Sequence, residues 1–169
     1  SIIVFDKDKS KTSGSSGIKV AANIAALIKE SEIVILAVKP QDFDPVLDEI
    51  KGLSKDKLLI SIAAGLNSQY LEKKIGSIRI VRAMPNIGVK IGAGLTCLSK
   101  GTFAQEEDFD FVKLLFNSMG RTMRIEERMM SAATAVSGSG PAYVCEYLQS
   151  RSLGMDNTTS QIKEDFLHD

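Results

Sequence analysis

Four short apolar runs rich in β-branched residues recur in the first half of the chain, and stretches compatible with helix separate them. The runs cover residues 2–5, 33–38, 58–62 and 78–82. Apolar residues recur at helical spacing between them, in residues 21–29, 43–50 and 68–75. Because strands joined through helices need crossover connections, this alternation favours a mostly parallel sheet with helices on both faces.

The second half of the chain continues this pattern and then becomes helical. We expect an edge strand at residues 95–98, an amphipathic helix at 105–119, a strand at 122–125, a helix from Glu127, a loop at 137–141 and a helix from Pro141 through Leu148. The expected fold class is α/β, a Rossmann-like mostly parallel sheet flanked by helices and followed by the start of a helical segment.

Three domains follow from this division of the chain. We expect residues 1–125 to form a Rossmann-like domain of the kind that binds dinucleotides, 126–149 to begin a helical segment, and 150–169 to form a polar tail. The chain opens on Ser-Ile-Ile-Val-Phe without an initiator methionine, so we expect further sequence upstream.

Composition argues against several classes of partner. The 21 basic and 21 acidic residues are interspersed and give a formal charge of zero, so we expect no nucleic-acid partner. The apolar runs are far shorter than the roughly 20 residues that span a bilayer, and we expect no membrane segment. Cys97 and Cys145 lie far apart in the sequence and His168 is at the C-terminus, so we expect no metal site. We expect both cysteines to be buried, inert thiols, which is consistent with a cytoplasmic location.

Residues that directly follow the strands are the candidates for ligand binding, because ligands of this fold lie outside the carboxyl ends of the strands. Asp6 follows the first run and favours the ribose diol of NAD. Lys7, Lys9 and Lys11, with nearby hydroxyl groups, instead favour the 2′-phosphate of NADP. A solvated charged loop explains the same residues equally well, and the cofactor preference stays open.

Four later turns could bind a ligand or could have a purely structural role. Lys39 and Pro40 end the second run, and Ile62 to Gly65 end the third with small side chains that allow close approach. Arg82 to Asn86 brings an amide that could face a nicotinamide or a small substrate, and Ser137 to Tyr143 brings glycines and donors suited to an anion. Close helix packing, an Asx turn and a helix-linking turn are the structural alternatives.

The order and wording of these turns resemble the pyrroline-5-carboxylate reductase family. The matching pieces are Ala-Val-Lys-Pro at 37–40, Ser-Ile-Ala-Ala-Gly at 61–65, Arg-Ala-Met-Pro-Asn at 82–86 and Ser-Gly-Ser-Gly-Pro-Ala-Tyr at 137–143. The resemblance covers about residues 1–149. It implies NADP as cofactor, with NAD as the alternative, and it implies a small-molecule substrate.

The resemblance also implies site residues. Asn23 would touch the adenosine end of the cofactor, and Glu127 would lie near the bound imino acid or proline. The structural alternative for Glu127 is an exposed carboxylate at a helix N-terminus. The residues expected to line the cofactor are Ala37, Val38, Lys39, Pro40, Ile62, Ala63 and Ala64.

The implied reaction is hydride transfer from NAD(P)H to the C=N bond of 1-pyrroline-5-carboxylate, giving L-proline. The cofactor supplies this chemistry, so no catalytic nucleophile or metal is expected. Relative to the family, we expect the dinucleotide-binding domain of residues 1–125 to be incomplete at its N-terminus, where the opening strand with its glycine-rich turn is lacking. Residues 126–149 would be only the start of the C-terminal helical dimerisation domain through which the full-length enzymes form homo-oligomers, and residues 150–169 would be a divergent tail in place of the rest of it. We therefore expect the chain as given to be inactive. The alternatives are a non-catalytic truncated module that serves in binding, or a related NADP-dependent imine or ketone reductase.

Overall fold

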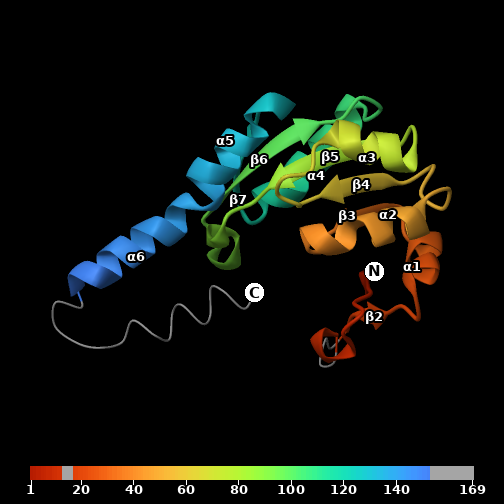
Figure 1. The fold of residues 1–169 in the computed structure, drawn as a ribbon, viewed down its shortest axis with the longest axis horizontal. Coiled ribbons are helices and arrows are strands. Elements are labelled where there is room, and N and C mark those ends of the chain that lie inside the picture. Colours follow the sequence, from red (N-terminus) through yellow and green to blue (C-terminus); the bar gives the residue numbers. More distant parts are fainter. Residues whose placement is uncertain (13–16, 153–169) are drawn as a thin grey trace.

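The computed structural model describes residues 1–12 and 17–152, which contain a five-stranded sheet and a separate two-stranded sheet (Figure 1). The large sheet has the order β3-β4-β5-β6-β7, with bounds β3 (Ile33–Leu36), β4 (Leu58–Ser61), β5 (Arg79–Met84), β6 (Gly94–Lys100) and β7 (Gly120–Arg124). Strands β3, β4 and β5 are parallel, β6 runs antiparallel to β5, and β7 is parallel to β6. The expected mostly parallel, Rossmann-like sheet is confirmed.

The small sheet pairs β1 (Ile3–Val4) with β2 (Lys19–Val20) in parallel. The first expected strand is therefore present but short, and β2 was not expected. Strand β2 follows a stretch rich in lysine and serine, part of which forms a 3₁₀ helix at Lys9–Lys11. Residues 13–16 of that stretch lie outside the described part of the chain.

Helices cover both faces of the large sheet. Their bounds are α1 (Ile24–Glu30), α2 (Phe43–Ile50), α3 (Ser68–Ile75), α4 (Glu106–Asn117), α5 (Met130–Ala133) and α6 (Gly140–Ser152). Because strand side chains alternate between faces, Leu59 packs into one core cluster with α1, α2 and α3, whereas Leu58 and Ile60 pack into the other with α4.

Side-chain caps explain where several helices begin. Helices α2 and α3 have the bounds expected from the sequence, and the Oδ1 atom of Asn67 accepts a hydrogen bond from the Tyr70 amide at the start of α3. Helix α1 begins three residues later than expected. Asn23 caps it by accepting a hydrogen bond from the Ala26 amide at 2.8 Å, which ends the preceding extended segment.

The expected loop at residues 137–141 is wrong. A π-helix occupies Thr134–Gly138, and α6 begins at Gly140. Serine and glycine favour turns in isolation, but the Ser139 amide donates to the Thr134 carbonyl at 2.9 Å and continues the helical backbone. Few backbone donors are left there for an anion. The helix expected from Glu127 is also broken into a 3₁₀ turn, α5 and the π-helix.

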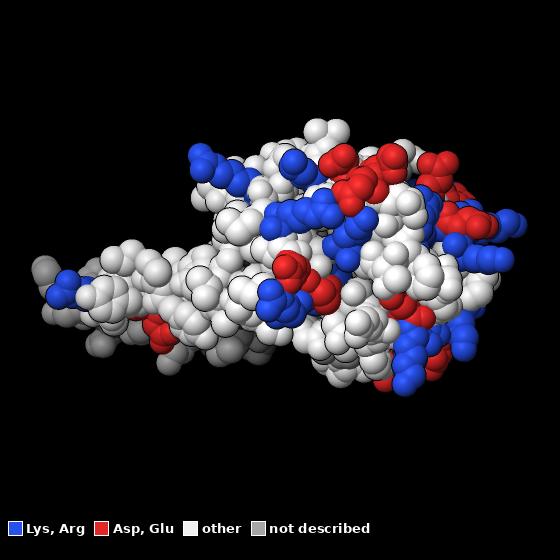
Figure 2. Space-filling model, turned by 90° about the horizontal axis from the view of Figure 1, so that it is seen from above, with Lys and Arg blue, Asp and Glu red and all other residues white. Residues whose placement is uncertain are grey.

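Helix α6 projects away from the sheets (Figure 1), and its apolar side chains are largely exposed. Tyr143, Val144, Tyr147 and Leu148 are each more than half exposed. Figure 2 shows acidic and basic residues interspersed over the body of the molecule, with the projecting helical part mostly uncharged. The expected divergent tail begins within α6, and its residues from 153 on lie outside the described part.

Candidate functional site

The carboxyl ends of three parallel strands place the expected cofactor turns side by side. Leu36, the last residue of β3, pairs with Ser61 of β4, which pairs in turn with Arg82 of β5. The Ile62 amide donates to the Leu36 carbonyl at 3.2 Å. The segments 37–40 and 62–64 therefore leave the same edge of the sheet as neighbours, although their role toward a cofactor stays a prediction.

Within the first of these segments, Ala37 and Lys39 are exposed and Val38 is half-buried against the core. Pro40 opens a 3₁₀ helix at Pro40–Asp42 instead of a simple turn. The exposed backbone and the Lys39 ammonium can therefore meet a ligand at this edge.

Within the second segment, Ala64 is exposed, Ile62 is half-buried and Ala63 is only 6% exposed. The Ala63 carbonyl accepts a hydrogen bond from the Arg82 guanidinium at 2.9 Å. Its side chain and carbonyl are thus committed to the protein, so Ala64 offers the more accessible surface. At Gly65, where φ is +78°, an added Cβ would meet nothing within 4 Å, so the backbone there borders open space.

The connection after β1 reaches the segment after Pro40. The Lys7 ammonium lies 2.5 Å from Oδ1 of Asp42, and Oδ1 of Asp6 accepts a hydrogen bond from the Asp8 amide at 2.8 Å. One carboxylate oxygen of Asp6 is therefore occupied by a neighbouring amide, and the Lys7 ammonium is occupied by the carboxylate of Asp42. Asn23 lies after β2 and is exposed, with its Oδ1 used in capping α1.

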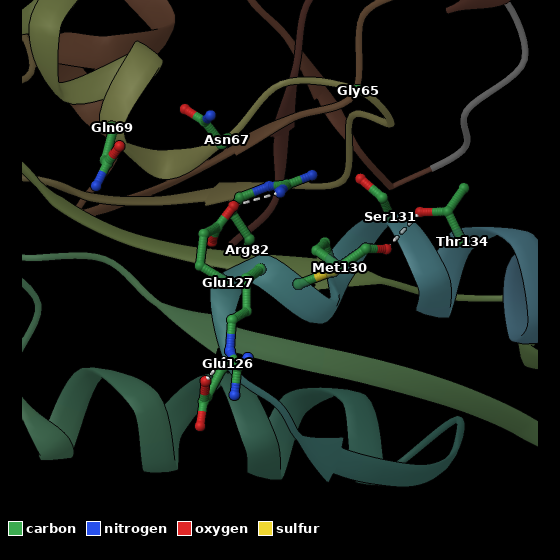
Figure 3. A pocket seen from close by; sticks show the side chains of 10 residues that line it. Gly65, Asn67, Gln69, Arg82, Glu126, Glu127, Met130, Ser131 and Thr134 are labelled. Carbon is green, nitrogen blue, oxygen red and sulfur yellow. Dashed lines mark hydrogen bonds and ion pairs between the residues drawn. The ribbon is translucent and has the colours of Figure 1, made fainter.

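A cavity of about 750 Å³ lies beside this edge, between the turn before α3, strand β5 and the segment that leads into α5 (Figure 3). Arg82 and Glu127 point toward each other at its wall, and Nη1 of Arg82 lies 2.6 Å from Oε1 of Glu127. Glu127 is 26% exposed and Arg82 only 4% exposed. The structural alternative of an exposed helix-terminal carboxylate is therefore wrong for Glu127, although Glu126 next to it is exposed and pairs with Arg128.

The ion pair was not foreseen from the sequence. Strand β5 extends to Met84, so Arg82 lies inside the strand and not at its end. A charged residue within an apolar strand was the available signal. Asn86 lies beyond the strand, and its Oδ1 accepts hydrogen bonds from the Gly88 and Leu95 amides, which matches the Asx-turn alternative.

The cysteines differ from the expectation in one respect. Cys97 is buried in β6, and burial raises the pKa of its thiol. Cys145 is exposed because α6 projects from the body, so the expectation of a buried thiol is wrong there. Among the described residues, no group of three or more His, Cys, Asp and Glu side chains could hold a metal ion. No helix in the same part of the chain has the length and apolarity to cross a bilayer.

Comparison with known proteins confirms the resemblance to pyrroline-5-carboxylate reductases. A family model described as NADP oxidoreductase coenzyme F420-dependent matches residues 2–65. Pyrroline-5-carboxylate reductase of Arabidopsis thaliana is 40% identical over 131 residues, which are 77% of this chain and 48% of the relative. The Methanosarcina acetivorans enzyme of the same name is 36% identical over 140 residues, 82% of this chain and 52% of the relative.

Solved structures agree with these sequence matches. Pyrroline carboxylate reductase of Plasmodium falciparum, solved with NADP bound, has a TM-score of 0.81 and 34% identity, and the match covers 88% of this chain and 55% of that one. The Streptococcus pyogenes 1-pyrroline-5-carboxylate reductase has a TM-score of 0.83 and 28% identity, covering 95% and 63%. The chain spans about half the length of the curated relatives it matches.

Proposed function

We propose that this chain belongs to the pyrroline-5-carboxylate reductase family and supplies the cofactor-facing half of an NADP-dependent reductase site. The proposed reaction reduces the C=N bond of 1-pyrroline-5-carboxylate to give L-proline. The observation that carries the proposal is the common edge from which segments 37–40 and 62–64 leave the sheet, with Ala63 of the second segment bound by Arg82 of the Arg82–Glu127 pair. The similarity to a reductase solved with NADP bound supports the same proposed function.

The residues at this edge fit a dinucleotide. Ala37, Lys39 and Ala64 are exposed where two parallel strands end, and Gly65 borders open space. Lys9 and Lys11 are exposed on the connection after β1, where cations favour the 2′-phosphate of NADP, whereas Asp6 already accepts a local hydrogen bond. Asn23 would approach the adenosine end. The exposed lysines on the connection after β1 support NADP as the cofactor.

The chemistry of the site then needs placement more than protein-derived reactive groups. Reduced nicotinamide, when bound, supplies the hydride that the C=N carbon accepts. Glu127 is the acidic residue of the pair that faces the cavity, and a carboxylate favours a protonated imine nitrogen beside it. Its Oε2 is buried without a hydrogen-bond partner among the described residues, so a donor that reached it would satisfy it.

Cofactor binding by the 169-residue chain is the first test. Titration with NADPH, followed by nicotinamide fluorescence, should saturate, and NADH should bind more weakly. The variant Ala64→Glu places a carboxylate at the proposed phosphate-bearing edge and should weaken NADPH binding at least tenfold. The matched control Leu53→Glu adds the same charge in the exposed turn before β4, at the opposite end of the strand, and should change binding less than twofold. Equal effects of the two variants would contradict the proposed edge.

Activity is tested in a chimaera in which residues 1–149 replace the matching segment of the Methanosarcina acetivorans enzyme. Oxidation of NADPH with 1-pyrroline-5-carboxylate should exceed background in the chimaera. The Glu127→Ala version should lose most of that rate while still binding NADPH. A chimaera that binds NADPH but shows no turnover with this substrate would count against the assigned reaction.

We also propose that the protein acts as a homo-oligomer in the cytoplasm. The exposed apolar side chains of α6 support self-association, because a projecting apolar face is stabilised when a partner covers it. Sedimentation of the chimaera should give a mass above that of one chain, and the double variant Tyr143→Lys, Tyr147→Lys should reduce it. The cytoplasmic location can be checked by fractionation of cells that express a tagged chain.

A further inference from the structure

Arg82 occupies an unusual place for a charged side chain. It lies within β5, the central strand of the five-stranded sheet, between Ser61 of β4 and Ser99 of β6. Its side chain shares a face with Ile80, which belongs to the main apolar cluster, and it is 4% exposed. Burying a guanidinium there is unfavourable unless partners compensate it, so the contacts of Arg82 should explain its presence.

Those contacts join two parts of the site that are distant in sequence. Nη1 of Arg82 binds Oε1 of Glu127 at 2.6 Å (Figure 3), and Nη2 donates to the carbonyl of Ala63 at 2.9 Å. Ala63 lies in the turn after β4, which we assign to the cofactor, whereas Glu127 begins the 3₁₀ turn that leads into α5. The amide of Ser68, the first residue of α3, lies 3.4 Å from the same Oε1.

The pair is not fully satisfied by these contacts. Nε of Arg82 and Oε2 of Glu127 are both buried, and neither has a hydrogen-bond partner among the described residues. An ion pair that served stability alone would leave such atoms unpaired only at a cost, and buried ion pairs are in general weak contributors to stability. The arrangement therefore suits a positioning role at a site where a ligand completes the hydrogen bonding.

Arg79, on the same strand, offers a structural comparison. Its Nη1 binds Oδ1 of Asp108 at 2.7 Å, and its Nη2 donates to the Asp56 carbonyl at 3.0 Å. The two arginines thus make the same kinds of contact, one carboxylate and one backbone carbonyl. Arg79 lies at the opposite end of β5, away from the ligand edge, and is 41% exposed.

We propose that Arg82 is a positioning residue that holds the Ala63 turn and Glu127 as one unit, so that the cofactor side and the substrate side of the site are ordered together. The proposal rests on the proposed function for the identity of the ligands. Its structural part, the coupled ordering of the two segments, is independent of that identity. Lysine cannot replace arginine here, because one ammonium does not supply a planar fork directed at both acceptors.

The experiment uses the 169-residue chain and the variants Arg82→Met, Arg82→Lys and Arg79→Met. Amide hydrogen exchange is measured on residues 61–68 and 125–131, and NADPH affinity is measured by fluorescence. In Arg82→Met, exchange should accelerate at least tenfold in both segments, and the NADPH Kd should rise about tenfold, as expected for loss of a charge-assisted hydrogen bond that shapes the turn. In Arg82→Lys, amide exchange should stay slow in residues 125–131, around Glu127, and should be as fast in residues 61–68 as it is in Arg82→Met.

Arg79→Met controls for general loss of stability, because it removes a similar pair at the far end of the strand. It should leave the NADPH Kd within about twofold and should not accelerate the two segments selectively. Equal exchange in Arg82→Met and Arg79→Met, or acceleration of only one segment, would overturn the positioning role. If Arg82→Met proves unfolded by circular dichroism, the pattern in Arg82→Lys decides in the same way.

The two proposals fail in different ways. Absence of saturable NADPH binding by the wild-type chain would contradict the cofactor assignment, and the exchange pattern would still support or refute the role of Arg82. Normal NADPH binding with unchanged exchange in Arg82→Met would refute the role of Arg82 and leave the cofactor assignment standing.

Discussion

Removal of Glu127 should destabilise the fold more than removal of Arg82. The variant Glu127→Leu leaves a guanidinium that is 4% exposed without its counter-ion, whereas Arg82→Met leaves a carboxylate that is 26% exposed and reaches water more readily. Loss of one partner from a buried pair costs about 3–5 kcal/mol. Because the Ala63 carbonyl still accepts from Arg82, we expect the low end, about 3 kcal/mol, for Glu127→Leu and about 1.5 kcal/mol for Arg82→Met.

The double variant Arg82→Met, Glu127→Leu should recover part of the stability that Glu127→Leu loses, since apolar residues of similar volume replace both charges. We expect it to be about 1.5 kcal/mol less stable than the wild type, which corresponds to a coupling free energy of about 3 kcal/mol between Arg82 and Glu127. Urea unfolding followed by far-ultraviolet circular dichroism measures these differences, provided that the slope m is the same in all four proteins.

A surface ion pair provides the control for this cycle. Lys19 and Glu30 lie 2.5 Å apart, but their side chains are 58% and 46% exposed. The same cycle at this pair should give a coupling of at most about 1 kcal/mol. A coupling between Arg82 and Glu127 no larger than that of the surface pair, or a greater loss from Arg82→Met than from Glu127→Leu, would refute the reasoning from burial.

Three further predictions concern the fold around the site. Ile80→Ala removes a fully buried side chain from β5 and should lower the free energy of unfolding by about 2–5 kcal/mol in urea titrations, with little change in m. Gly120→Ala should lower the melting temperature strongly, because φ is +143° there and the added Cβ would meet backbone atoms of Gly94; Gly76→Ala, also at positive φ but in open space, should cost less. Hydrogen bonds from Arg124 and a neighbouring lysine lower the pKa of Glu106 to about 2 from 4.5, so its stabilising effect is present above pH 4.5 and is lost as pH falls toward 2. The stability difference between wild type and Glu106→Gln should therefore shrink over that range in pH-dependent unfolding, and an unchanged difference would contradict the shift.

Local sequence was enough to predict the parts of the fold that depend on periodicity and capping. The apolar spacing in residues 43–50 and 68–75 matches the bounds of α2 and α3, because each helix buries one face, and α3 also begins beside the capping residue Asn67. The runs that became β3 and β4 were equally clear, since nearly every side chain in them is apolar. Both faces of β4 are covered, whereas β3 is an edge strand on which Ile35 is 51% exposed. The order of helices and strands then limited the sheet to a mostly parallel form.

The rest of the fold depended on contacts that are distant in sequence. Strand β2 is two residues long, and only its pairing with Ile3 and Val4 defines it. The segment from Thr134 to Gly138 has the composition of a turn, yet it forms a π-helix where α5 packs against β6 and continues toward α6. Local preference is weak for such short pieces, and tertiary packing overrides it.

The candidate site divides in the same way. The sequence by itself determined that turns at residues 37–40 and 62–64 follow two parallel strands and leave the sheet at a common edge. The role of these turns toward a ligand stays a prediction. Only the tertiary structure decided that Ala63 faces inward, that Glu127 is half-buried and that Arg82 binds both. The physical reason is that an ion pair depends on distance and burial, and residues separated by 45 positions acquire these only when the sheet and its helices pack together.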